Sequence, residues 1–150
     1  YQLSTNLSNN EARALANLQE AYDYLKNEIG AEKIGIIGWC LGGKWSLKAS
    51  LMLPTEIDAS VIYYGSLTDD KERLETLEMP IIGFVGTKDR LHKQFIQFDE
   101  DLKGLNKEAS IHFYEGAKHA FANASGGAYE SNAAEDSWKK TVDFLDKHLN

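Results

Sequence analysis

Apolar residues recur along the chain with two different periods, and the two kinds of segment alternate. In residues 10–29 apolar side chains return every three or four positions, which is typical of one face of an α-helix. The stretch KIGIIGW that follows is short and apolar, as expected of a strand buried on both faces. The same alternation continues: further helices are predicted at about 43–53, 71–77, 93–105 and 129–149, and further strands at 58–65, 79–86 and 109–116.

Strands that alternate with helices predict an α/β fold with a parallel sheet and right-handed crossovers. The chain has 150 residues and no internal repeat or linker, so we expect a single domain over residues 1–150. Apolar spacing also predicts which helix faces are buried. The face of the first helix is predicted to comprise Ala14, Leu15, Leu18, Ala21, Tyr22 and Leu25, with Ser8 or Asn9 as N-cap and Gly30 at its end. The face of the last helix is predicted to comprise Ala133, Ala134, Trp138, Val142, Leu145 and Leu149.

Composition and charge narrow the class of protein. Hydrophobic residues make up 43% of the chain, which indicates a globular protein, and the formal charge of −7 argues against a nucleic-acid surface. No apolar stretch approaches the length that spans a membrane, and the first residues are too polar for a secretory signal. The single cysteine excludes an internal disulfide and fits a reducing compartment, so we expect a cytoplasmic protein.

The single cysteine lies in a short glycine-bounded motif, Gly38-Trp39-Cys40-Leu41-Gly42, between a predicted strand and a predicted helix. This is the form of a nucleophile elbow, in which a strained strand-to-helix turn exposes the central side chain. Glycines on both sides are expected to let strand and helix approach each other. The thiol would then lie at a helix N-terminus, and the N–H of Leu41 could stabilise an oxyanion. The alternative is that Cys40 is a small core residue, as free cysteines often are.

Two further residues have the order along the chain that an elbow enzyme requires. Asp89 follows the third predicted strand and His119 follows the fourth, so both are expected at the sheet edge where Cys40 lies. Together they predict a Cys–His–Asp triad. Asp89 could instead be a turn residue and His119 a surface residue, while the other three histidines are interpreted as structural. A metal site made of the same residues is disfavoured because no closely spaced ligand pair is present.

The segments GIIGWCLGG, VIYYG, GFVGTKD and HFYEGAKHAFAN together resemble the dienelactone hydrolases, also called carboxymethylenebutenolidases. The resemblance covers nearly the whole chain. It implies a three-layer α/β-hydrolase-like parallel sheet, truncated here to the C-terminal four strands with flanking helices, because the family has a further N-terminal portion. It implies a triad of Cys40, His119 and Asp89, hydrolysis through an acyl-enzyme, and no metal or organic cofactor.

The resemblance also bears on the substrate. Family members acting on dienelactone carry an arginine where this chain has Asn123, and often a serine where it has Ala120. A bidentate carboxylate anchor is therefore missing, which favours a neutral small ester or lactone. The residues expected to line the substrate pocket are Trp39, Tyr64, Leu91, Phe121 and Asn123.

Three alternatives to an active hydrolase stay open at this point: a weak or inactive module that binds a ligand, one that binds a protein partner, and a reactive-thiol sensor. Without the family's preceding strands, KIGIIG would be an exposed apolar edge strand, which is an aggregation hazard. We therefore expect a homo-oligomer in which a second copy covers this edge, and no nucleic-acid or membrane partner.

Overall fold

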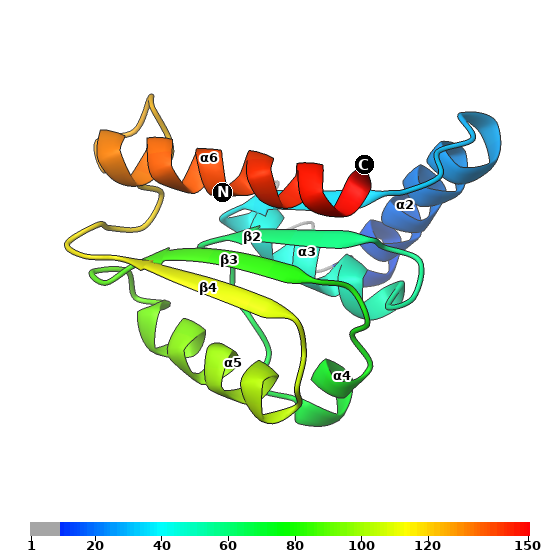
Figure 1. Cartoon of the computed structure of the whole chain (residues 1–150), viewed down its shortest axis with the longest axis horizontal. Helices are drawn as coiled ribbons and strands as arrows, with labels where there is room; N and C mark the ends of the chain where they lie inside the picture. Colours follow the sequence, from blue (N-terminus) through cyan, green and yellow to red (C-terminus); the bar gives the residue numbers. More distant parts are fainter. Residues whose placement is uncertain (1–9) are drawn as a thin grey trace.

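The computed structural model describes residues 10–150, which form one four-stranded sheet with helices on both faces (Figure 1). The strands lie in the order β1-β2-β3-β4, and each neighbouring pair is parallel. Their bounds are β1 (Gly35–Trp39), β2 (Ala59–Tyr63), β3 (Ile81–Gly86) and β4 (Ala109–Tyr114). The predicted α/β fold is confirmed, and each strand lies within the range that the apolar pattern predicted.

The helices complete three layers. They are α2 (Glu11–Asp23), which continues into the π-helical turn η1 (Tyr24–Glu28), α3 (Leu41–Met52), α4 (Lys71–Glu75), α5 (His92–Gly104) and α6 (Ser131–Leu149). In Figure 1, α6 crosses one face of the sheet, while α4 and α5 lie on the other. The α3 helix packs on the same face as α4 and α5, because its apolar side chains share one core with theirs. None of the helices in residues 10–150 combines the length and the apolar character needed to cross a membrane.

Alternating side chains of the strands divide the interior into two cores. On the α3–α5 face, Ile62, Ile81 and Val85 pack with Leu47, Phe95 and other helix residues. On the α6 face the buried strand residues are Val61, Tyr63, Ile82 and Phe84. Every residue of β2 and β3 is buried, whereas β1 is mostly half-buried, because among residues 10–150 it has a neighbouring strand on one side only.

The predicted apolar face of α6 is partly wrong. Trp138 is 53% and Val142 47% exposed, whereas the polar residues Ser137 and Thr141 are buried. The Thr141 hydroxyl lies 2.7 Å from the Tyr63 hydroxyl, so the two groups satisfy each other inside the α6 core. Ala133, Phe144 and Leu145 of α6 pack in the same core, so the side of α6 that faces the sheet combines apolar residues with a hydroxyl pair that apolar spacing does not reveal.

The first helix also differs from its prediction. Ala14 is its one fully buried residue, and Leu25 of the predicted face is 40% exposed. Its N-cap is Asn10, while the predicted caps Ser8 and Asn9 lie outside the described residues. Gly30 follows the end of η1, as predicted.

Candidate active site

Cys40 lies at the turn between β1 and α3 in a strained backbone conformation. Its φ is 55° and its ψ is −114°, a combination that L-residues seldom adopt and that costs on the order of 1–3 kcal/mol. Two hydrogen bonds hold it there: the Cys40 N–H donates to the Tyr63 carbonyl, and the Cys40 carbonyl accepts from the Lys44 N–H. The turn leaves Cys40 exposed, so the geometry matches the predicted elbow.

Only one of the two glycines that bound the motif makes the turn possible. A Cβ on Gly38 would lie 2.1 Å from the carbonyl oxygen of Gly42, so any side chain there would push β1 and α3 apart. A Cβ on Gly42 would meet nothing within 4 Å. The expectation that both glycines are needed for close approach is therefore corrected: Gly38 carries it.

Asp89 and His119 come from the loops that follow β3 and β4. The Asp89 carboxylate is fully buried and accepts two hydrogen bonds, one from the Leu91 N–H at 2.9 Å and one from His119 Nδ1 at 2.8 Å. The other ring nitrogen of His119, Nε2, lies 3.1 Å from Cys40 Sγ. Because a carboxylate can only accept, Nδ1 carries the proton, which leaves Nε2 of a neutral ring free to accept one from the thiol.

The two loops are fastened to each other, which sets the distance between Asp89 and His119. The Lys88 N–H donates to the Ala117 carbonyl at 3.0 Å, and the Gly116 N–H donates to the Thr87 hydroxyl at 2.8 Å. The backbones are so close that a Cβ on Gly86 would lie 2.1 Å from the Ala117 oxygen. A substitution that widens this backbone contact would therefore move His119 relative to Asp89.

A hollow of about 390 Å³ opens beside the Cys40 thiol. It is lined, apart from Cys40, by Trp39, Tyr64, Ala120, Ala122 and Asn123. The rings of Tyr64 and His119 meet edge to face, with their centres 5.2 Å apart. Burial raises the pKa of Tyr64 far above its ordinary range, and the neighbouring Cys40 adds to this shift, so the hydroxyl remains a hydrogen-bond donor.

Three of the five predicted lining residues, Trp39, Tyr64 and Asn123, line this hollow, and two do not. The Phe121 side chain is fully buried in the core below α6, and the Leu91 side chain packs against the opposite core. Ala120 and Ala122, which the sequence interpretation overlooked, take their place. Since Phe121 points inward, its two small neighbours point outward, a pattern that the apolar phenylalanine between two alanines could have suggested.

The other histidines contact aromatic rings away from the thiol. His112 stacks on Phe84, and burial lowers the pKa of His112 while nearby Lys140 adds to the effect. His92 contacts Phe113, and His148 contacts Phe144. Within residues 10–150, no group of three or more His, Cys, Asp or Glu side chains is arranged to hold a metal ion.

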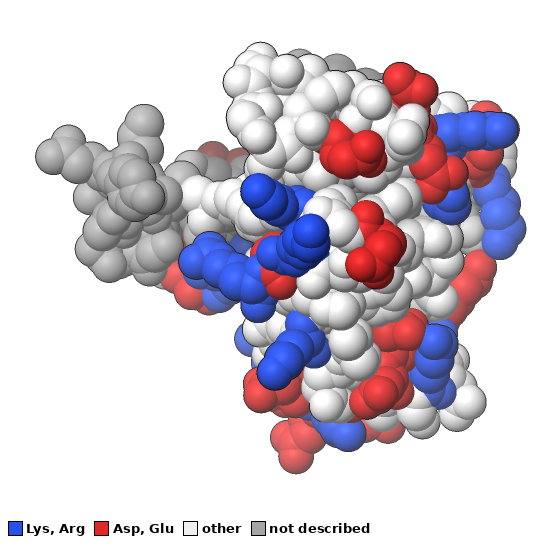
Figure 2. All heavy atoms as spheres, turned by 90° about the vertical axis from the view of Figure 1, so that its left-hand side faces the viewer, with Lys and Arg blue, Asp and Glu red and all other residues white. Residues whose placement is uncertain are grey.

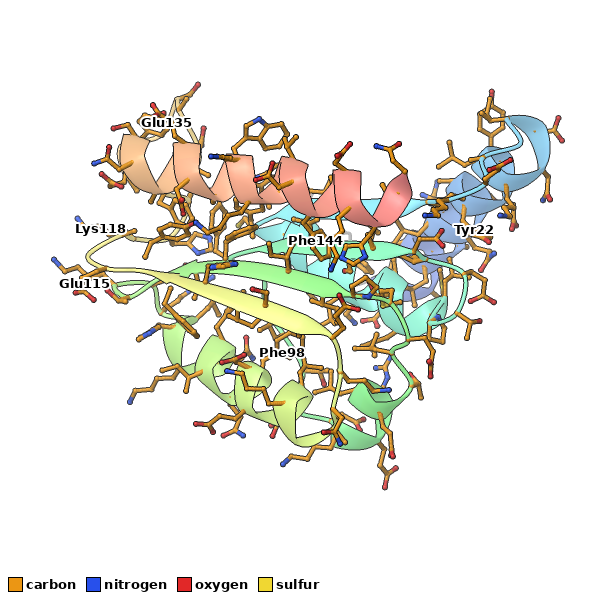
Figure 3. The ribbon with its side chains drawn as sticks, in the orientation of Figure 1. Tyr22, Phe98, Glu115, Lys118, Glu135 and Phe144 are labelled. Carbon is orange, nitrogen blue, oxygen red and sulfur yellow. The ribbon has the colours of Figure 1, made fainter. Side chains whose placement is uncertain are left out.

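The surface at this end of the sheet is charged. Figure 2 views the molecule from the side on which β4 ends, and both basic and acidic side chains border an uncharged area. Figure 3 shows Glu115 and Lys118 pointing outward on the loop that carries His119. These charges lie around the site, whereas the residues that line the hollow include no Asp, Glu, Lys or Arg.

The chain is similar to known proteins over most of its length. The family model "Dienelactone hydrolase family" matches residues 2–149. A carboxymethylenebutenolidase of Pseudomonas putida is 28% identical over 134 residues, which are 87% of this chain and 56% of the relative. Protein usf of Aquifex pyrophilus is 30% identical over 143 residues, 89% of this chain and 60% of the relative.

A solved structure described as a dienelactone hydrolase-like promiscuous phosphotriesterase from metagenomic libraries has the same fold. Its TM-score is 0.82 at 18% identity, and the match covers 97% of this chain and 66% of that one. The chain thus spans a little over half the length of the curated relatives it matches. On the family match over nearly all its residues, the chain belongs to the dienelactone hydrolase family.

Proposed function

We propose that this chain hydrolyses a small ester or lactone with Cys40 as nucleophile, His119 as base and acid, and Asp89 as the residue that positions His119. The observation that carries the proposal is the continuous relay from Cys40 Sγ through both nitrogens of His119 to the buried Asp89 carboxylate. Family membership supports hydrolysis as the reaction class.

In the first half of the reaction, His119 Nε2 takes the thiol proton while the sulfur attacks the carbonyl carbon of the substrate. The carbonyl oxygen becomes an oxyanion, which the N–H of Leu41 can stabilise because first-turn N–H groups of a helix lack an acceptor within it. When the intermediate collapses, the bond to the leaving oxygen breaks and that oxygen takes the proton from His119. Cys40 is then a thioester.

In the second half, His119 removes a proton from a water molecule that attacks the thioester. The carbon–sulfur bond breaks, the acid product leaves, and the proton returns to sulfur. Throughout, the buried Asp89 carboxylate stabilises the protonated imidazole. Leu41 is the oxyanion donor that we identify among residues 10–150, and removing a donor of this kind typically costs about a hundredfold or more in rate.

The hollow favours a substrate without charge near the reacting carbonyl. Its lining is aromatic or aliphatic apart from the Asn123 amide and the Tyr64 hydroxyl, so it offers hydrogen bonds but no cation for a carboxylate. We infer that a neutral ester or lactone with a small acyl group binds there, with its carbonyl between Cys40 and Leu41.

Hydrolysis of p-nitrophenyl acetate by purified wild type, Cys40→Ala and Thr55→Ala tests the proposal. Thr55 is an exposed residue of the turn that precedes β2, so Thr55→Ala is a matched control at the other end of the sheet. We expect Cys40→Ala to fall to the uncatalysed rate and Thr55→Ala to match wild type. Equal rates for Cys40→Ala and wild type would refute a cysteine hydrolase. A wild type that iodoacetamide alkylates but that hydrolyses no ester would favour a reactive-thiol sensor.

Self-association through β1 stays a prediction. In the described part of the chain the strand is at a sheet edge, and Trp39 at its end is 40% exposed. The Cys40 N–H donates to the Tyr63 carbonyl, so the backbone groups of even-numbered residues in this segment face β2. The N–H of Ile37 therefore points away from β2. Light scattering of Ile37→Pro tests this edge: fewer associated molecules than in wild type would support pairing at β1, and unchanged association would contradict it.

A further inference from the structure

The second edge of the sheet, β4, also has unpaired backbone groups. The Ile81 N–H donates to the Glu108 carbonyl, and the Thr87 N–H donates to the Tyr114 carbonyl, so even-numbered residues of this segment bond to β3. The N–H and C=O groups of Ala109, Ile111 and Phe113 therefore point outward. Among residues 10–150 no strand lies beyond β4, which forms the front edge of the sheet in Figure 1.

Edge strands are usually protected by proline, charge or a covering segment, because an open edge pairs with other chains. The β4 sequence ASIHFY contains no proline, lysine or acidic residue. Phe113, whose backbone faces outward, is 37% exposed. Residues 109–114 thus carry none of the usual protection within themselves, and charged residues begin just outside them.

We propose that a second copy of this chain pairs its β4 antiparallel with the first, so that the two sheets join into one across a two-fold axis at Ile111. Residues whose backbone N–H and C=O groups point outward must lie opposite one another in such a pair. A two-fold axis at Ile111 achieves this, because Ile111 then lies opposite Ile111 of the second copy and Ala109 lies opposite Phe113. The large phenylalanine side chain then lies opposite the smallest side chain of the strand, as close cross-strand packing requires.

Charge complementarity favours this register. Counting outward from Ile111, Lys107 of one copy lies opposite Glu115 of the other, and the symmetry repeats the pair at the far end. Glu115 is exposed and points into solvent in Figure 3, and Lys107 is half-buried. Neither side chain forms an ion pair with any other residue in the described part, whereas the adjacent Glu108 is bound by Lys147.

The β1 edge lacks such a pattern. An antiparallel pairing centred on Ile37 places Lys33 opposite Leu41 and Glu32 opposite Gly42, so no opposite charges meet. Attraction between copies at β1 would rest on backbone and apolar contacts alone. Opposite charges at both ends specify the direction and register of pairing at β4. The second copy would also hold Glu115, where the loop that carries His119 begins.

Sedimentation of the full chain compares matched proline variants at the two edges. In each, the lost N–H points away from the neighbouring strand, so pairing within the chain is kept. We expect a wild-type dimer at micromolar concentration, a monomer for Ile111→Pro, and a dimer for Ile37→Pro. A monomeric wild type, or dissociation by Ile37→Pro and not by Ile111→Pro, would overturn the proposal.

Charge exchange tests the register without touching the strand. Lys107→Glu alone puts two glutamates together at each end, and Glu115→Lys alone puts two lysines together. Each variant should dimerise about tenfold more weakly than wild type, because two attractive pairs become repulsive. An equimolar mixture of the two variants restores both attractive pairs, so it should form a heterodimer at wild-type strength. A mixture that associates no better than either variant alone would overturn the proposal, even if Ile111→Pro fails to fold.

Discussion

Asp89→Asn tests whether Asp89 positions His119 and sets its tautomer, because the substitution keeps the size of the side chain and changes its hydrogen bonds. The two oxygens of Asp89 have different partners, the Leu91 N–H and His119 Nδ1. An asparagine keeps the size but has a single acceptor oxygen, and the Leu91 N–H requires an acceptor. The amide NH2 group then faces His119, so Nδ1 must accept and the ring proton moves to Nε2. An Nε2 that carries a proton cannot take one from Cys40.

The expected effect is large for so small a change. The same exchange in a Ser–His–Asp triad costs about 10⁴-fold in kcat through the wrong histidine tautomer, and a thiol gives up its proton more readily than a hydroxyl. We therefore expect a loss of about 10²–10⁴-fold in kcat/KM, or roughly 3–5 kcal/mol of transition-state stabilisation. Iodoacetamide alkylation of Cys40 at neutral pH should slow in parallel.

The assay is p-nitrophenyl acetate hydrolysis, with Asp58→Asn as the matched control. Asp58 also accepts a backbone hydrogen bond, from the Ile34 N–H at 2.7 Å, but it contacts no histidine. Asp58→Asn should keep its rate within about twofold. A folded Asp89→Asn with kcat/KM within tenfold of wild type would show that Asp89 does not set the tautomer of His119.

Three further substitutions test the contact between the two loops of the site and the stability of the fold. Gly86→Ala should lower kcat/KM by about a hundredfold, because its Cβ displaces the Ala117 backbone, whereas Gly104→Ala, with open space around it, should have no effect on the rate. Thr141→Val should lower the free energy of unfolding by about 1–3 kcal/mol in urea, and adding Tyr63→Phe should recover most of it, since no buried hydroxyl is then left unpaired. The lowered pKa of His112 means that the unfolded chain takes up the proton first as the pH falls below about 6.5, so stability is lost there. Between pH 7.5 and 5.5, which is about one unit on either side of that value, the free energy of unfolding of His112→Gln should fall less than that of wild type. Equal losses would contradict a lowered pKa of His112 in the folded chain.

The sheet could be predicted because each strand is a short apolar run between polar turns. β2 and β3 are buried on both faces, so their composition alone separates them from the helices. The order of Cys40, Asp89 and His119 along the chain was also readable, since parallel strands bring their carboxyl ends to one edge. The sequence predicted that these three residues meet, and in the structure they lie within hydrogen-bond distance.

Other features depend on contacts between segments far apart in the chain. Trp138 and Val142 fit an apolar helix face, yet the side of α6 that faces the sheet carries Thr141, which meets Tyr63 from β2. Gly38 and Gly42 differ because a Cβ on Gly38 would meet the backbone of α3, whereas a Cβ on Gly42 would meet nothing. Local patterns do not contain these distances, so the spacing of residues could not predict them.

Mass spectrometry of the protein quenched in acid during turnover of p-nitrophenyl acetate tests directly whether Cys40 is the nucleophile. We expect wild type to carry one acetyl group that maps to the peptide containing Cys40 and accumulates before steady state. We expect Cys40→Ala to carry no acetyl group and to give no burst of p-nitrophenol. An acetyl group on another residue, or steady hydrolysis by Cys40→Ala at the wild-type rate, would show that Cys40 is not the nucleophile.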